Sequence, residues 1–356
     1  MIARALLVVL VLGVVGVQKG EAVRGASGAV DGLTLEQQVG QAIVLSFSGT
    51  TVPDYVSEAL AERRVAGVIL FGGNISGPEQ LRSLTRDLRR YGGRPIVAVD
   101  QEGGRVRRLP WAGPRAEQPA QLARGTVRSA AAAAARALRA AGITVTFAPV
   151  ADVPSVRGAA LAGRSFTRDP DAASDAVRAA VRGWRSGGVA PTAKHFPGLG
   201  GAPTNTDDAI VTIGRSRAAL DAVDLPPFRA AIGAGVPLVM VGHARYPALD
   251  RTRIASQSRP IVEGLLRDEL GFRGVVVTDS LEAQASLATG SITKVSERAL
   301  RAGADLLLLT GRGSYAPVYE HVLAAASRSP ELRARVREAA IRVLALKSRG
   351  APPPPG

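Results

Sequence analysis

Eight short apolar runs recur along the chain, and each is followed by a longer segment with helical patterning. Such alternation is typical of parallel α/β folds. The runs cover residues 42–47, 67–71, 96–100, 145–149, 189–194, 238–243, 275–279 and 305–309. Helical segments include residues 78–91, 126–141, 171–186, 226–234 and 295–302, several of them closed by a glycine such as Gly142, Gly187 or Gly303. Eight units without a compositional break predict a single-domain (β/α)8 barrel, with a doubly wound sheet as the alternative.

The composition excludes several kinds of chemistry and bears on whether the protein binds nucleic acid. The chain has 356 residues and no cysteine, which rules out disulfides, thiolate metal sites and cysteine nucleophiles. A formal charge of +15 would suit a nucleic-acid partner if the basic residues gathered on one face. Instead, all but four of the 45 basic residues are arginines scattered along the helical segments. We therefore expect a solvated basic surface and no nucleic-acid partner.

The two ends of the chain differ from the rest. Arg4 precedes an apolar run over residues 5–17, and a small–x–small pattern ends at Ala22. This run is shorter than a membrane-spanning helix, so residues 1–22 are predicted to be a secretory signal peptide, with an uncleaved anchor as the alternative. Residues 350–356 form a proline-rich tail. The expected mature protein is exported, with one barrel domain over residues 30–349.

Polar residues end four of the apolar runs. These residues are Asp100, the pair Lys194 and His195, His243, and Asp279. In a (β/α)8 barrel the catalytic groups lie at the C-terminal ends of the strands, so the four positions are candidates for one site. Asp279 follows a fully apolar run and has the chemistry to attack an anomeric carbon; the alternative is that it caps a helix starting near Leu281.

Five motifs occur in an order that resembles family 3 glycoside hydrolases, and more narrowly their single-domain β-N-acetylhexosaminidases. They are Asp100-Gln-Glu-Gly-Gly-Arg-Val-Arg-Arg108, Phe147-Ala-Pro-Val-Ala-Asp152-Val, Gly163-Arg-Ser-Phe166 with Asp169-Pro170, Lys194-His-Phe-Pro-Gly198, and Val277-Thr-Asp279-Ser. The resemblance extends over residues 35–346. It implies a (β/α)8 barrel, in agreement with the count of apolar runs.

The resemblance also implies roles for individual residues. Asp279 matches the nucleophile of a retaining mechanism, which forms a covalent glycosyl intermediate. Residues that match those holding the sugar through its hydroxyl groups are Asp100, Arg108, Arg164, Lys194 and His195, and Arg164 is also expected to orient the N-acetyl group. Asp152 and His243 lie in matching segments and are assigned to substrate binding. Glu102 and Arg105 are expected to brace the loop after the third strand, and His321 to lie on the surface.

One family feature is missing. In the hexosaminidase branch, a His–Asp acid/base lies on a mobile loop after the Lys-His-Phe-Pro-Gly motif. Here that loop has no histidine, and Asp207 stands at the corresponding position, beside Asp208. A carboxylic acid can protonate a leaving group when its pKa is raised, so Asp207 is the candidate acid/base. The alternative is that both aspartates are solvated loop charges and catalysis is impaired.

The expected activity is that of an exported retaining β-N-acetylhexosaminidase acting on peptidoglycan-derived or related glycans. A β-glucosidase-like exo-glycosidase is one alternative. The other is a carbohydrate-binding homologue that has lost its acid/base. Hydrolysis by two carboxyl groups and water requires no cofactor, and the histidines and carboxylates show no metal-ligand spacing. We expect a monomer whose partner is a glycan containing N-acetylglucosamine.

Overall fold

The computed structural model describes residues 25–92 and 94–349. The predicted signal peptide, residues 1–22, and the proline-rich tail, residues 350–356, lie outside this part of the chain. No helix within it combines the length and the apolar character needed to cross a bilayer.

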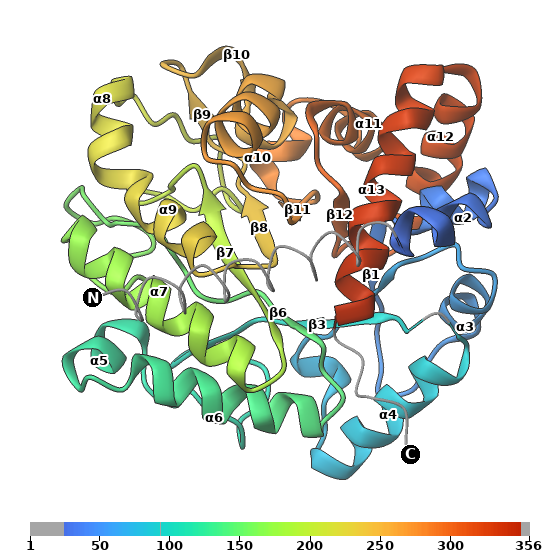
Figure 1. Cartoon of the computed structure of the whole chain (residues 1–356), viewed down its shortest axis with the longest axis horizontal. Helices are drawn as coiled ribbons and strands as arrows, with labels where there is room; N and C mark the ends of the chain where they lie inside the picture. The colour runs from blue at the N-terminus through green and yellow to red at the C-terminus, as the bar shows by residue number, and fades with distance from the viewer. Residues whose placement is uncertain (1–24, 93, 350–356) are drawn as a thin grey trace, which may run out of the picture.

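Eight parallel strands form a closed barrel, as the eight apolar runs predict (Figure 1). The strands are β1 (Ile43–Ser46), β2 (Gly67–Ile69), β3 (Ile96–Val99), β6 (Val145–Thr146), β7 (Ala190–Phe196), β8 (Leu238–Val241), β11 (Val275–Ser280) and β12 (Leu306–Leu309). Each strand pairs with the one before it and the one after it in this list. The last strand, β12, pairs with β1, with Leu307 opposite Ile43. This last pairing closes the sheet and excludes the doubly wound alternative.

Alternate residues of each strand point to two separate apolar cores. On β1, Val44 belongs to the cluster inside the barrel, whereas Ile43 and Leu45 belong to the larger cluster between the strands and the helices. Period-two alternation of Cβ directions produces this division. Both sides of most barrel strands are therefore apolar, which is why these strands read as continuous hydrophobic runs.

Helices follow the strands and surround the barrel (Figure 1). They are α3 (Asp54–Ala61), α4 (Pro78–Arg90), α5 (Gln118–Ala123), α6 (Val127–Ala140), α7 (Pro170–Ser186), α8 (Arg217–Ala219), α9 (Pro226–Gly233), the π-helix η4 (Pro260–Glu269), α10 (Gln284–Leu287), α11 (Ile292–Ala302), α12 (Tyr315–Arg328) and α13 (Pro330–Arg349), with α2 (Leu35–Gly40) before β1. The five helical segments predicted from the sequence are confirmed to within three residues at each end.

The glycines expected to end helices act in two different ways. Gly303 caps α11 with φ of 115°, a left-handed conformation that glycine adopts without a steric penalty. Gly187 caps α7 with φ of −87°, so a left-handed turn does not explain it. A Cβ at Gly187 would lie 2.3 Å from the Ala135 side chain on α6. Gly187 therefore permits the close packing of α6 against α7.

Segments after three strands build the face that carries the polar strand ends. A hairpin of β4 (Gln101–Gly103) and β5 (Val106–Arg107) follows β3, and a second hairpin of β9 (Arg245–Tyr246) and β10 (Asp250–Ile254) follows β8. The segment between Phe196 and Arg217, after β7, contains Asp207. These three segments lie at the C-terminal ends of their strands, where a barrel of this kind places its chemistry.

Candidate active site

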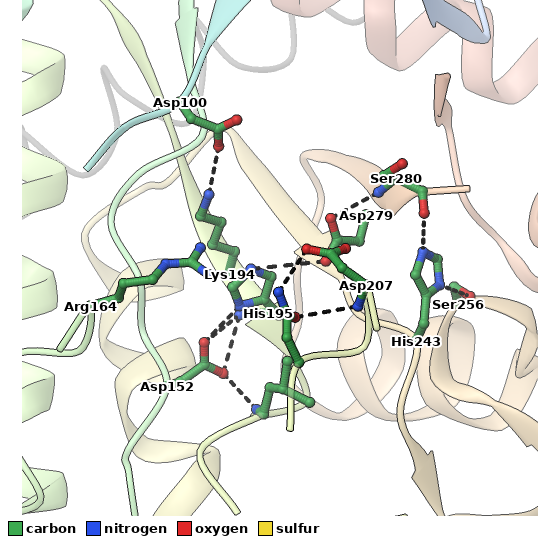
Figure 2. A network of polar contacts seen from close by, with 12 residues as sticks. Asp100, Asp152, Arg164, Lys194, His195, Asp207, His243, Ser256, Asp279 and Ser280 are labelled. Atoms are coloured by element: carbon green, nitrogen blue, oxygen red, sulfur yellow. Dashed lines mark hydrogen bonds and ion pairs between the residues drawn. The ribbon is translucent and has the colours of Figure 1, made fainter. Parts of the chain in front are cut away.

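The polar strand ends converge at the C-terminal mouth of the barrel (Figure 2). Asp100 follows β3 directly, Lys194 and His195 lie in β7, and Asp279 lies in β11. The Lys194 Nζ atom is 2.8 Å from Asp100 Oδ1, and His195 Nε2 is 3.9 Å from Asp279 Oδ2. These contacts join strands that are far apart in the sequence. The predicted convergence of the strand ends is therefore confirmed.

Lys194 is the centre of a buried cluster of charges. Its Nζ contacts Asp100 and also Glu102 Oε1, at 2.7 Å. Glu102 in turn accepts two hydrogen bonds from the Arg164 guanidinium, at 2.9 and 2.7 Å. Burial would raise the pKa of Glu102, but the charges of Lys194 and Arg164 outweigh it and lower the pKa to about 2. Glu102 is therefore ionised and holds both cations in place.

Arg108 and Asp100 form the more open side of this cluster. The Arg108 guanidinium lies 3.8 Å from Asp100 Oδ2 and stacks over the Phe71 ring, 5.5 Å from its centroid. Both side chains retain some exposure, 32% for Arg108 and 17% for Asp100. They can therefore reach a ligand in the barrel mouth, whereas Glu102, 2% exposed, is covered.

Asp152 fixes the orientation of His195. Asp152 Oδ2 lies 2.8 Å from His195 Nδ1, and the carboxylate also accepts the backbone N–H groups of His195 and Leu199, the latter at 2.6 Å. This leaves His195 Nε2 pointing toward Asp279. The Asp152 side chain is fully buried. The sequence assigned Asp152 to substrate binding; its contacts in the structure are with His195 and Leu199, and through them it positions His195.

His243 lies beside the site with both ring nitrogens occupied. Its Nδ1 is 2.8 Å from Ser256 Oγ, and its Nε2 is 2.8 Å from the backbone carbonyl oxygen of Ser280. The residue is fully buried. His243 therefore fastens the end of β11 to the segment after β10, and the geometry favours this positioning role over the sugar contact expected from the sequence.

Asp279 is a partly exposed carboxylate near His195, His243 and Lys194. Its Oδ1 accepts the Ser280 N–H at 2.8 Å, and its side chain is 18% exposed. Burial acts to raise the pKa of Asp279, but His195, His243, Lys194 and that N–H group outweigh it and lower the pKa. No helix begins at Leu281, because α10 starts at Gln284 with Ala283 as its cap, so the helix-cap interpretation is wrong.

Asp207 lies beside Asp279 and His195 in Figure 2. Its segment is fastened to the start of α10, where the Gln284 N–H donates to the Asp207 carbonyl oxygen at 3.1 Å. The Asp207 carboxylate accepts a hydrogen bond from Asn205 Nδ2 at 2.7 Å, although the residue as a whole is exposed. Partial withdrawal from water, and then the negative charge of Asp279, raise the pKa of Asp207.

Two residues were not predicted to belong to the site. Glu102 was expected to brace a loop, yet it lies beneath Lys194 and Arg164. Asn205 was given no role, yet it holds the Asp207 carboxylate. The spacing of Glu102, two residues after a polar strand end, is the only sequence signal that could have indicated its position. Arg105 pairs with Glu117, and the partly exposed His321 pairs with Glu297.

The barrel mouth holds one carboxylate of lowered pKa and one of raised pKa, a combination that suits hydrolysis of a glycosidic bond. Most retaining glycosidases hydrolyse their substrate with an ionised carboxylate as nucleophile and a protonated carboxyl group as acid at the same site. Within the described residues, no group of three or more histidine or acidic side chains is arranged to hold a metal ion. The fold and the site are those of a glycoside hydrolase.

Comparisons with known proteins identify the family. The model of the glycosyl hydrolase family 3 N-terminal domain matches residues 34–346. A β-hexosaminidase of Nitrosomonas eutropha is 34% identical, over 75% of this chain and 80% of that protein. A protein of Arthroderma benhamiae described as a secreted glycosyl hydrolase is 33% identical, over 89% of this chain and 94% of that protein.

A solved structure agrees with the sequence matches. The family 3 β-N-acetylglucosaminidase of Paenibacillus sp. FPU-7 is 35% identical, with a TM-score of 0.86 over 89% of this chain. The alignment covers 63% of that longer protein. The chain belongs to glycosyl hydrolase family 3.

Proposed function

We propose that this protein is a retaining β-N-acetylhexosaminidase in which Asp279 is the nucleophile and Asp207 the acid/base. The observation that carries this proposal is that the two carboxylates lie beside each other at one mouth (Figure 2), in surroundings that lower the pKa of Asp279 and raise that of Asp207. When the surroundings of two carboxyl groups separate their pKa values, the group with the lower pKa serves as nucleophile and the group with the higher pKa serves as acid. The names of the β-hexosaminidase and β-N-acetylglucosaminidase relatives support the choice of sugar.

The first chemical step forms a glycosyl-enzyme ester. An Asp279 carboxylate oxygen bonds to the anomeric carbon as the bond from that carbon to the glycosidic oxygen breaks. The Asp207 carboxyl group transfers its proton to the departing oxygen, which leaves as an alcohol. His195 Nε2, 3.9 Å from Asp279, helps keep the attacking carboxylate ionised.

The second step returns the enzyme to its starting state. Asp207, now a carboxylate, accepts a proton from water as the water oxygen bonds to the anomeric carbon. The ester bond to Asp279 breaks, and the sugar is released with the anomeric configuration it had in the substrate. Both carboxyl groups recover the protonation states with which they began.

The charge cluster beneath the mouth is proposed to hold the sugar ring. Lys194, Asp100, Arg108 and Arg164 together offer donors and acceptors for hydroxyl groups, and Arg164 is the candidate to orient an N-acetyl group. Because Glu102 and Asp100 hold the Lys194 ammonium at 2.7 and 2.8 Å, its direction is set before substrate arrives. Such preorganisation reduces the ordering cost of binding. His195 is the remaining proposed contact to the sugar.

The proposal also includes export of the protein and the source of its substrate. Residues 1–22 have the composition of a signal peptide, and a relative of similar length is described as secreted. An exported enzyme of this specificity would act, as a monomer, on peptidoglycan-derived or related glycans that contain N-acetylglucosamine. Immunodetection of the full-length protein in culture medium and cell fractions tests the export.

The roles of the two aspartates are tested with substrates that differ in their leaving group. Asp207→Ala should reduce kcat/KM for an alkyl N-acetyl-β-glucosaminide by about 10²- to 10⁴-fold, and should barely affect a nitrophenyl substrate, because only the poor leaving group needs protonation. Asp279→Ala should abolish turnover of both. Equal losses on the two substrates would remove Asp207 from the acid role, and activity in Asp279→Ala would overturn the mechanism.

A second candidate is a carbohydrate-binding protein without turnover. It is favoured by the exposure of Asp207 at the position where the family's hexosaminidases have a histidine. Calorimetry with N-acetylglucosamine, beside an assay of N-acetyl-β-glucosaminide hydrolysis, separates the two: binding without turnover supports the second candidate. A matching assay with an aryl β-glucoside tests the β-glucosidase alternative.

A further inference from the structure

An open pocket of about 510 Å³ lies on the catalytic face, outside the cluster of proposed catalytic and sugar-binding groups. It is formed by the β9–β10 hairpin after β8 and by the segment from α10 to α11 after β11. Its lining residues are Arg245, Thr252, Arg253, Ile254, Gln257, Thr289 and Arg298. Three of these seven residues are arginines and none is acidic.

The charges of this pocket are not balanced by the described part of the chain. None of the three lining arginines forms an ion pair with a carboxylate of residues 25–92 or 94–349, and the Nε atom of the lining residue Arg245 is buried without a hydrogen-bond partner. An unpaired buried donor on a charged group is costly. A ligand that accepts from Arg245 Nε would remove that cost.

Two carboxylates near the pocket are held by other groups. Asp250, in the hairpin, accepts from the backbone N–H groups of Thr252 and Arg253 and from the hydroxyl groups of Thr252 and Ser258. Glu297, the neighbour of Arg298 in sequence, pairs with Arg301 and His321. Neither carboxylate pairs with an arginine of the lining, although that of Asp250 lies against Thr252.

The pocket is also held in shape. Arg298 donates to the Thr289 carbonyl oxygen at 2.8 Å, and Gln257 donates to the Thr289 hydroxyl at 2.7 Å. The Gln257 bond joins the segment after the hairpin to the segment before α11, whereas the Arg298 bond lies within the α11 side of the pocket. Guanidinium groups in a fixed setting bind carboxylate and phosphate oxygens through paired, charge-assisted hydrogen bonds.

We propose that this pocket is an anion-binding site for a phosphate or carboxylate group of a ligand that contacts the catalytic face. The backbone of Arg245 bridges Thr212, five residues after Asp207, so the site borders the segment that carries Asp207. The pocket contains none of the residues assigned to hydrolysis. The inference therefore goes beyond the proposed function and does not depend on it.

Calorimetric titration of the full chain with inorganic phosphate, and separately with glucuronate, tests the proposal. Saturable binding of at least one anion is expected, with a change in the NMR signal of the Arg245 Nε–H group. Tighter binding of phosphate would assign a phosphate-bearing ligand, and tighter binding of glucuronate a carboxylate-bearing one. The absence of saturable binding of both anions would overturn the proposal.

Matched variants locate the binding. The double variant Arg245→Gln/Arg253→Gln should weaken the affinity at least tenfold, whereas Arg251→Gln, an exposed arginine of the same hairpin outside the pocket lining, should leave it unchanged. Equal weakening in both variants would mean attraction to the general positive charge, and would overturn the site. The exposed single variant Arg253→Gln, expected to weaken binding severalfold, keeps the test valid if the double variant does not fold.

Discussion

At the scale of single residues, the site depends on which charge lies next to which. Asp279 and Asp207 are both aspartates, yet the neighbouring histidines and Lys194 lower the pKa of the first, whereas burial and then the charge of Asp279 raise the pKa of the second. Environment therefore gives one residue type two proposed chemical roles. Glu102 has a different task, because it contacts Lys194 and Arg164 beneath the surface of the mouth.

The opposite shifts predict a bell-shaped pH dependence of kcat/KM. The rate should rise with pH as Asp279 ionises, below the ordinary aspartate range, and fall as Asp207 loses its proton, above that range. In Asp207→Asn, assayed with a good leaving group, the falling limb should disappear because no acid remains to titrate. A falling limb identical to that of the wild type would assign it to another group.

Glu102→Gln should impair binding and catalysis through the cations it holds. Removing one partner of a buried ion pair costs about 3–5 kcal/mol of stability, and misplaced positioning groups can cost about 10²-fold in rate. Glu117→Gln, which removes the exposed partner of Arg105 in the same region, should cost less than about 1 kcal/mol. Urea denaturation and kcat/KM measure both effects; similar values for the two variants would contradict the bracing role.

At the scale of elements, each strand delivers residues to the mouth, and the last helix closes the opposite end. Val343 and Leu346 of α13 join the apolar cluster inside the barrel. Lys347, next along the helix, lines a cavity of about 170 Å³ and donates to Gln41 Oε1 at 2.7 Å. Burial, followed by the charge of Arg63, lowers the pKa of Lys347 to about 7.

The lowered pKa of Lys347 makes stability depend on pH. An unfolded lysine has a pKa near 10.5, so between that value and about 7 the unfolded chain binds a proton that the folded chain does not. The free energy of unfolding should therefore fall as pH decreases through this window. Lys347→Met should reduce this slope and raise the urea midpoint at pH 7, whereas Lys294→Met, at an exposed position, should change neither. An unchanged slope in Lys347→Met would contradict the burial of the amine.

At the scale of the whole molecule, a buried carboxylate joins the barrel to its outer layer. Asp305, just before β12, accepts from Arg267 of η4 at 2.6 Å, from the Val276 N–H of β11 at 2.9 Å and from Arg342 of α13 at 3.0 Å. Arg335 of α13 also contacts it. One side chain thus connects two strands of the barrel with two helices around it.

Asp305→Ala should destabilise the fold more than any exposed ion pair would. Three arginines would lose their shared counter-charge, and breaking a buried pair costs about 3–5 kcal/mol. Asp31→Ala removes an exposed partner of Arg337, also on α13, and should cost less than about 1 kcal/mol. Urea denaturation of both variants compares them, and equal losses would show that the Asp305 cluster does not stabilise the barrel.

The sequence by itself determined the barrel and the residues at its strand ends. Alternation and apolar runs are local properties, and a chain with eight such units places every strand end at one mouth. Only the tertiary structure decided which of these residues touch. Arg164 meets Glu102 across 62 positions, and Lys194 meets Asp100 across 94. Local patterns carry no record of such contacts, so the hydrogen bonds by which the buried Asp152 and His243 hold His195 and Ser280 could not be predicted from the sequence.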